Sequence, residues 1–133
     1  MKRLNIDILE DIKSFNSEAS LQKAVVNYIK IRWPGVRYCA SLGGQYQKYP
    51  SQRKVAKDTG YVAGFPDLQI LEARGGYFGL FIEIKLDKRC YASQYQKDWI
   101  EDLKDRGYMA QICKGYDECI DLLESYFINK KTH

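Results

Sequence analysis

Histidine is almost missing from this sequence, since the only one is His133 at the C-terminal end. This scarcity argues against a histidine general base and against a Ser-His-Asp triad, because both need a histidine held inside the folded body. The four cysteines include no Cys-x-x-Cys pair, so a zinc site of the usual Cys/His kind is not predicted either. Carboxylates and lysines remain as the candidate catalytic groups.

Long apolar runs are also missing. The segment Met1–Asp7 lacks the apolar core of a signal peptide, and no stretch is apolar enough to cross a bilayer. We therefore expect a cytoplasmic protein whose cysteines are reduced, buried thiols. The length of 133 residues predicts a single domain, 1–133, and the net charge of +4 permits nucleic-acid binding without requiring it.

The order of expected helices and strands predicts an α/β sandwich around a mixed sheet. Ser17 can cap the first helix, and Tyr95, Trp99 and Leu103 form one stripe at a spacing of four residues. We expect this stripe and Trp33 to pack in the core. The expected elements are a leader helix around 8–12, a helix at 17–33, a strand at 36–40, a loop at 43–64, strands at 66–71 and 77–85 joined by a turn at 72–76, a helix at 91–106, a strand at 108–113 and a helix at 116–127.

Two carboxylates and a lysine stand near the ends of two expected strands. Side chains alternate across a strand, so Glu83 and Lys85 point to one face and Ile84 to the other, and a hairpin would bring Asp67 alongside Glu83. Two adjacent carboxylates repel each other unless a divalent cation binds their oxygens, and a nearby lysine can then orient a water. This set suits phosphodiester hydrolysis. Each motif alone also fits a plain structural role, an ion-paired strand for Glu-Ile-Lys and a turn for Pro-Asp.

The stretch 46–57 mixes cations with tyrosines and contains no acid. Cations neutralise phosphates and tyrosine rings stack on bases or sugars, so a loop that follows DNA is one interpretation and a solvated flexible loop is the other. The segment 87–89 is mixed in sign and predicts an exposed turn. The candidate nucleic-acid-binding residues are Lys48, Arg53, Lys54 and Lys57.

Four stretches carry a family resemblance: Glu18-Ala19-Ser20-Leu21-Gln22, Gly64-Phe65-Pro66-Asp67-Leu68, Phe81-Ile82-Glu83-Ile84-Lys85, and Ala92-Ser93-Gln94-Tyr95-Gln96 with Trp99, Leu103 and Gly107. Through them the sequence from Glu18 to Cys113 resembles the PD-(D/E)XK nuclease superfamily, and more narrowly its VRR-NUC branch. Ala92 stands where the family usually has leucine, which is a conservative departure. The fold implied is a restriction-endonuclease-like core, a mixed four-stranded sheet flanked by helices.

The resemblance implies a nuclease site that holds Mg²⁺ or Mn²⁺. Asp67, Glu83 and the backbone carbonyl of Ile84 would bind the metal, with Glu18 as a further candidate ligand. Lys85 would position the attacking water or stabilise the phosphate. Glu18 also fits a purely structural role at a helix N-terminus, where an acid interacts favourably with the helix dipole, and Gln96 fits an ordinary surface amide. The residues implied to be catalytic are Glu18, Asp67, Glu83, Lys85 and Gln96.

The resemblance also implies partners. We expect the substrate to be DNA, in the form of junctions, flaps or related branched structures. We also expect a homodimer of phage or bacterial origin that acts in the cytoplasm, or in the host cytoplasm if it is phage-encoded. Neither a small-molecule cofactor nor a membrane is expected as a partner. Two alternatives remain open at this point. One is a non-catalytic nucleic-acid-binding module, and the other is an accessory nuclease subunit that requires a partner.

Overall fold

The computed structural model describes residues 15–41 and 48–132, and the statements below concern these residues. The leader helix expected around 8–12 lies outside them. Within the described ranges, no helix is both long and apolar enough to cross a membrane. The elements are α2 (Glu18–Arg32), β1 (Tyr38–Ala40), α3 (Pro50–Asp58), β2 (Leu68–Ile70), β3 (Leu80–Lys85), α4 (Gln94–Asp105), β4 (Met109–Lys114) and α5 (Tyr116–Phe127).

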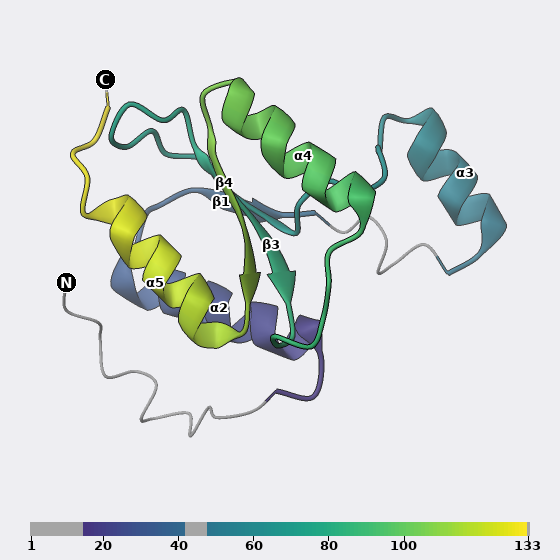
Figure 1. Ribbon diagram of the computed structural model, residues 1–133, viewed down its shortest axis with the longest axis horizontal. Coiled ribbons are helices and arrows are strands. Elements are labelled where there is room, and N and C mark those ends of the chain that lie inside the picture. The colour runs from purple at the N-terminus through teal and green to yellow at the C-terminus, as the bar shows by residue number, and fades with distance from the viewer. Residues whose placement is uncertain (1–14, 42–47, 133) are drawn as a thin grey trace.

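The four strands form one mixed sheet in the order β1-β2-β3-β4. β2 is antiparallel to both β1 and β3, whereas β3 and β4 are parallel and are connected through α4. Helices α2 and α5 cover one face of the sheet and α4 covers the other (Figure 1). The α/β class with a mixed four-stranded sheet flanked by helices, expected from the sequence, is confirmed.

Alternation along β3 divides its side chains between two cores. Ile82 and Ile84 are fully buried in the larger core, which they share with α2 and α5. Phe81 points to the opposite face and packs with Ile100 and Leu103 of α4. Because side chains alternate, Glu83 lies on the Phe81 face. The strand therefore leads a polar side chain out of an apolar core at its C-terminal end.

The β2–β3 connection contains a tight turn at Gly75-Gly76. Arg74 and Tyr77 exchange two backbone hydrogen bonds, N–H to O=C, of 3.2 and 2.9 Å. The two glycines have φ of +58° and +87°, the left-handed conformation that two-residue hairpin turns require. The turn expected at 72–76 is confirmed, although β3 begins only at Leu80. This connection fixes the register of β2 against β3, on which the site depends.

The expectation of a loop across 43–64 is wrong for Pro50–Asp58, which form α3. Proline at the first helical position is already in the helical φ range, and the Gln52 side chain accepts the Tyr49 N–H at 3.0 Å. No residue of α3 is buried. Because the helix has no buried apolar stripe, no hydrophobic periodicity in the sequence predicts it. Its sequence signals are Pro50 and Gln52 at the N-terminal end.

The expectation that Tyr95 packs in the core is also wrong, because its side chain is 69% exposed in the first turn of α4. Leu103 is buried, and Trp99 is half-buried against the smaller core. Trp33, expected in the core, is partly buried against the larger core and stacks on Phe127 with ring centroids 4.3 Å apart. The four cysteines are free, but only two of them are buried, Cys113 and Cys119.

Candidate metal and nuclease site

The β2–β3 register brings Asp67 next to Glu83. Leu68 is paired with Ile82 in antiparallel strands, so Asp67, the residue just before β2, lies opposite Glu83 of β3. The Asp67 carboxylate accepts the backbone N–H of Ile84 at 2.8 Å, and the Asp67 carbonyl accepts the N–H of Ser41 at 2.8 Å. The hairpin proximity expected from the sequence is thus present, and Asp67 is held from two sides.

Glu83 is a buried carboxylate with little compensation. Glu83 is only 2% exposed, and its Oε1 has no hydrogen-bond partner within the described residues. Burial, followed by the hydrogen bond with Asp67 and the Asp67 charge, raises the pKa of Glu83 to about 9. Lys85, whose Nζ lies 3.6 Å from Glu83 Oε2, opposes this shift only in part. One lysine therefore does not neutralise this pair of acids.

The donors of this site fit a hard divalent cation. Asp67 and Glu83 offer carboxylate oxygens, one of which is buried without a partner. In a strand the N–H and C=O of one residue point to the same side, so the Ile84 carbonyl points toward the side on which its N–H meets Asp67. Among the described residues no three His, Cys, Asp or Glu side chains are grouped for metal binding. Two carboxylates and a carbonyl match the sparse protein ligation that Mg²⁺ accepts, with waters and phosphate oxygens as its other ligands.

Glu18 influences the site through its charge. It is the first residue of α2, after the Ser17 cap whose hydroxyl accepts the Ser20 N–H at 3.1 Å. Its negative charge raises the pKa of Glu83 less than burial or Asp67 does. The half-buried Glu18 thus lies within electrostatic range of Glu83 and at a helix N-terminus, so the geometry accommodates both roles weighed for it.

Gln96 has a structural task at the start of α4. Its Oε1 accepts the Ser93 N–H at 2.9 Å while the Ser93 hydroxyl accepts the Gln96 N–H at 3.2 Å, a reciprocal capping box. The Ser-x-x-Gln pattern in the sequence is the signal for this cap. The side-chain NH₂ of Gln96 is left to serve any further role.

A clamp between α4 and the segment before β2 was not recognised from the sequence. The Trp99 indole N–H donates to the Ala63 carbonyl at 3.1 Å, and its ring meets Phe65 edge-to-face at 5.0 Å. Gly64 has a φ of +91°, and a Cβ there would lie 2.6 Å from the backbone carbon of Tyr95. Only glycine lets the chain pass so close to α4. The clamp therefore sets the path by which the chain reaches Asp67.

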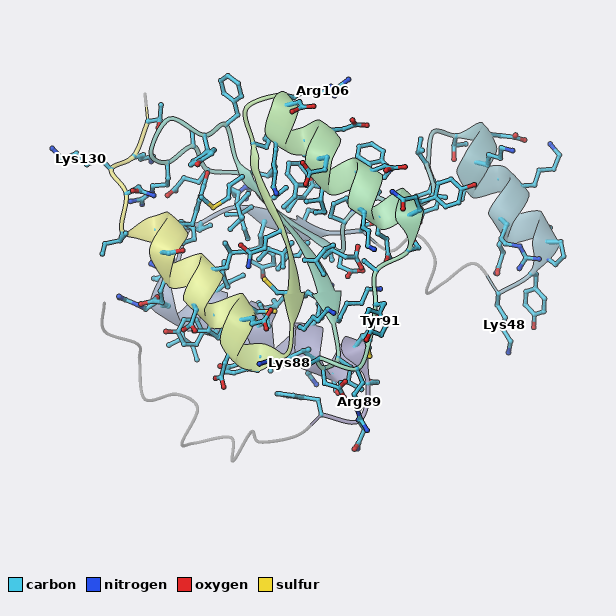
Figure 2. All side chains as sticks on the ribbon, in the orientation of Figure 1. Lys48, Lys88, Arg89, Tyr91, Arg106 and Lys130 are labelled. Atoms are coloured by element: carbon cyan, nitrogen blue, oxygen red, sulfur yellow. The ribbon has the colours of Figure 1, made fainter. Side chains whose placement is uncertain are left out.

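The four cations predicted to bind nucleic acid are all exposed and lie on α3 or immediately before it. Lys54 pairs with Asp58 at 2.6 Å, and the Arg53 guanidinium donates to the Lys48 carbonyl at 3.4 Å. Helix α3 stands to one side of the sheet and its covering helices, with Lys48 beside its N-terminal end (Figure 2). These cations therefore sit on an outlying helix, apart from the two carboxylates.

A mixed sheet that presents two carboxylates and a lysine at the meeting of adjacent strands defines a restriction-endonuclease-like nuclease fold. The VRR-NUC domain model matches residues 11–117 of the chain. A solved structure described as a VRR_NUC domain protein is 36% identical, covers 87% of this chain and 92% of its own, and superposes with a TM-score of 0.74. A search of curated proteins gave no match. The chain belongs to the VRR-NUC family, a nuclease-type family, as the sequence resemblance indicated.

Proposed function

We propose that this protein is a divalent-metal-dependent deoxyribonuclease that hydrolyses phosphodiester bonds in branched DNA. The observation that carries the proposal is the buried Glu83 carboxylate, with an unpartnered oxygen beside Asp67. An uncompensated buried charge is costly, and such groups are typically paired or bind metals. The ion pair with Lys85 involves Oε2 and leaves Oε1 of Glu83 without a binding partner, which a metal ion would supply.

In the proposed site, Asp67, Glu83 and the Ile84 carbonyl hold Mg²⁺ or Mn²⁺. The bound cation would lower the pKa of water and offset charge on the scissile phosphate. Lys85 is buried beside Glu83, which keeps its ammonium group directed into the site. There it positions the attacking water or stabilises negative charge on the phosphate in the transition state. The Asp67 carboxylate, fixed by the Ile84 N–H, defines the geometry of the metal-binding oxygens.

Supporting roles follow for the remaining candidates. Glu18 adds negative charge near the site, which favours a cation there. The exposed cations on and beside α3 supply contacts to DNA phosphates, because lysine and arginine release condensed counterions on binding. A homodimer would present two such sites to a branched substrate. A mass for the free protein that corresponds to a monomer, measured by light scattering at working concentration, would contradict the dimer.

A cleavage panel tests the proposal. Labelled linear, flapped and four-way-junction DNAs are incubated with Mg²⁺, Mn²⁺ or EDTA, using wild type, Asp67→Ala, Glu83→Ala and Lys85→Ala. Lys104→Ala serves as a matched lysine control, because Lys104 is exposed on α4 and pairs with the nearby Glu101 at 3.3 Å. We expect metal-dependent cleavage that the three site variants lose while they still bind DNA. Binding without cleavage by wild type under every metal would instead indicate a binding module or an accessory subunit.

A further inference from the structure

We propose that the loop after β3 and the end of β4 form a second nucleic-acid contact surface, which holds a single-stranded arm leaving the cleavage site. In this β3–α4 surface, Lys88, Arg89 and Lys114 contact backbone phosphates and Tyr91 stacks on a base. The surface begins three residues after Lys85. It rests on the proposed nuclease function and specifies the kind of DNA structure that the site would accept.

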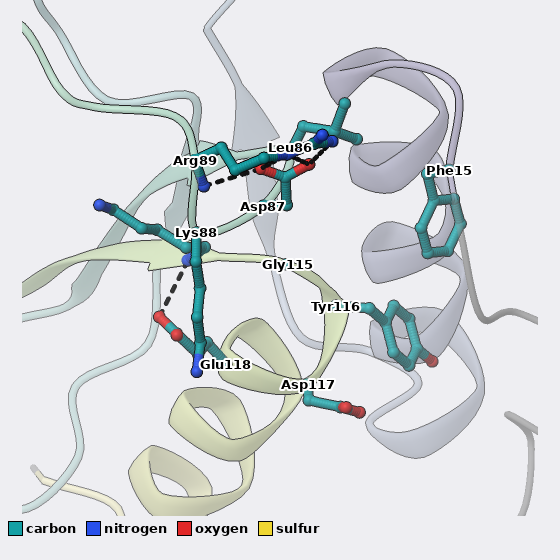
Figure 3. A pocket seen from close by; sticks show the side chains of 10 residues that line it. Phe15, Leu86, Asp87, Lys88, Arg89, Gly115, Tyr116, Asp117 and Glu118 are labelled. Atoms are coloured by element: carbon teal, nitrogen blue, oxygen red, sulfur yellow. Dashed lines mark hydrogen bonds and ion pairs between the residues drawn. The ribbon is translucent and has the colours of Figure 1, made fainter.

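The position of this surface favours a ligand. It lies at the carboxyl ends of the parallel strands β3 and β4, where the crevices outside α/β sheets commonly bind ligands. A hollow of about 590 Å³ opens there between the β3–α4 and β4–α5 connections (Figure 3). Lys88, Arg89 and Tyr91 gather around this end of the molecule, whereas α3 with Lys48 stands away from them (Figure 2). The two sets of cations are therefore separate contacts.

Tyr91 has the features of a stacking residue. Its side chain is 79% exposed and belongs to neither core cluster. The Lys114 ammonium lies 4.6 Å from the centre of its ring and covers one face by a cation–π contact. The opposite ring face remains available to solvent. A base can stack there only when it has no neighbour on that side, which favours single-stranded DNA over an intact duplex.

The cations of this surface are placed to contact individual DNA phosphates. Lys88 is exposed and forms no ion pair with any residue of the described ranges. Arg89 donates to Asp87 at 2.7 Å, which orients the guanidinium while its side chain stays 89% exposed. The backbone N–H of Lys114 donates to Glu118 at 2.9 Å, so a second carboxylate is also engaged. The carboxylates that line the hollow are those of Asp87, Asp117 and Glu118.

The first test removes the two exposed cations of the loop, Lys88 and Arg89. Lys88→Ala/Arg89→Ala is made in a Glu83→Gln background, so that DNA is not consumed, and binding to labelled single-stranded, flapped and blunt duplex DNA is followed by fluorescence anisotropy over a salt series. We expect the salt slope of log K to fall by about 1 for each lost phosphate contact on single-stranded and flapped DNA. Arg106→Ala/Lys130→Ala in the same background removes the same charge from the far end of the molecule and should leave the slope unchanged (Figure 2).

The second test removes the ring. Tyr91→Ala should weaken binding to single-stranded and flapped DNA about 10-fold and leave blunt duplex binding nearly unchanged, because stacking on one base is lost. Tyr91→Phe keeps the ring and should bind like the parent. Surface variants that match the Arg106/Lys130 control on all DNAs overturn this proposal and leave the nuclease function standing. If the Glu83→Gln parent binds none of these DNAs, the proposed surface is overturned, and the cleavage assay with wild type then shows separately whether the nuclease function stands.

Discussion

Replacing Glu83 by glutamine distinguishes a metal-binding carboxylate from an ordinary ion-paired one. The Glu83 side chain is buried, and its Oε1 has no partner within the part of the chain that the structure describes. Without metal, ionised Glu83 faces both desolvation and the adjacent Asp67. Glutamine keeps the shape, removes the charge and can donate its amide N–H to the Asp67 carboxylate. The variant should therefore be more stable than wild type in the absence of metal.

The expected gain follows from the raised pKa of Glu83. The pKa of Glu83 is about 9 in the folded protein and 4.5 in the unfolded chain. The contribution of Glu83 to the free energy of unfolding is therefore fully present below pH 4.5 and is lost as the pH rises toward 9. Each pH unit above 4.5 costs about 1.36 kcal/mol, which gives about 3 kcal/mol at pH 7. Glutamine does not titrate and avoids this loss. For a chain of this length the gain corresponds to a rise in Tm of about 10 °C.

Thermal unfolding in EDTA at several pH values measures this effect. Glu101→Gln is the control, because Glu101 is 70% exposed and its loss should change stability by less than about 0.5 kcal/mol. Added Mg²⁺ or Mn²⁺ at about 100 times Kd should stabilise wild type by about 2.7 kcal/mol and leave Glu83→Gln unaffected. A Glu83→Gln variant that is less stable than wild type at every pH, or equal stabilisation of both by metal, would refute the reasoning.

Three further outcomes are expected. Arg32→Ala leaves the buried Glu124 without its partner and should cost about 2 kcal/mol in urea unfolding, discounted because Arg32 is 35% exposed, whereas Lys30→Ala should cost almost nothing. Gly64→Ala forces a Cβ against the Tyr95 backbone at a φ of +91° and should reduce cleavage more than DNA binding, as kcat and KM will show. Chelation by EDTA should stop cleavage by wild type, and excess Mn²⁺ should restore it; activity that persists in EDTA would contradict a metal mechanism.

The sequence was sufficient wherever a short-range rule controls the structure. Alternation alone places Glu83 and Lys85 on one face of β3, and a glycine-rich turn explains why Asp67 meets Glu83. Helix α5 was expected at the residues where it is found, since its inward side chains recur at helical spacing. These features depend on neighbours in the chain, which a sequence displays directly.

The remaining features depend on contacts between distant segments. Tyr95 continues the apolar stripe of Trp99 and Leu103, but it lies in the first turn of α4 and is exposed there. The burial of Glu83, which makes its charge costly, results from packing around β3 and cannot be read from Glu-Ile-Lys. The hydrogen bond from Trp99 to Ala63 joins residues 36 positions apart, so no local pattern announces it.

The two tryptophans of the chain lie on opposite faces of the sheet. Trp33 stacks on Phe127 beside the larger core, and Trp99 holds the segment that leads into Asp67. Each face thus carries its own intrinsic fluorophore. With Trp33 replaced by phenylalanine, all tryptophan emission would come from Trp99. The wavelength and lifetime of that emission would report movement of the chain beside the carboxylates when metal or DNA binds. The clamp that positions the site is in this sense also an optical probe of it.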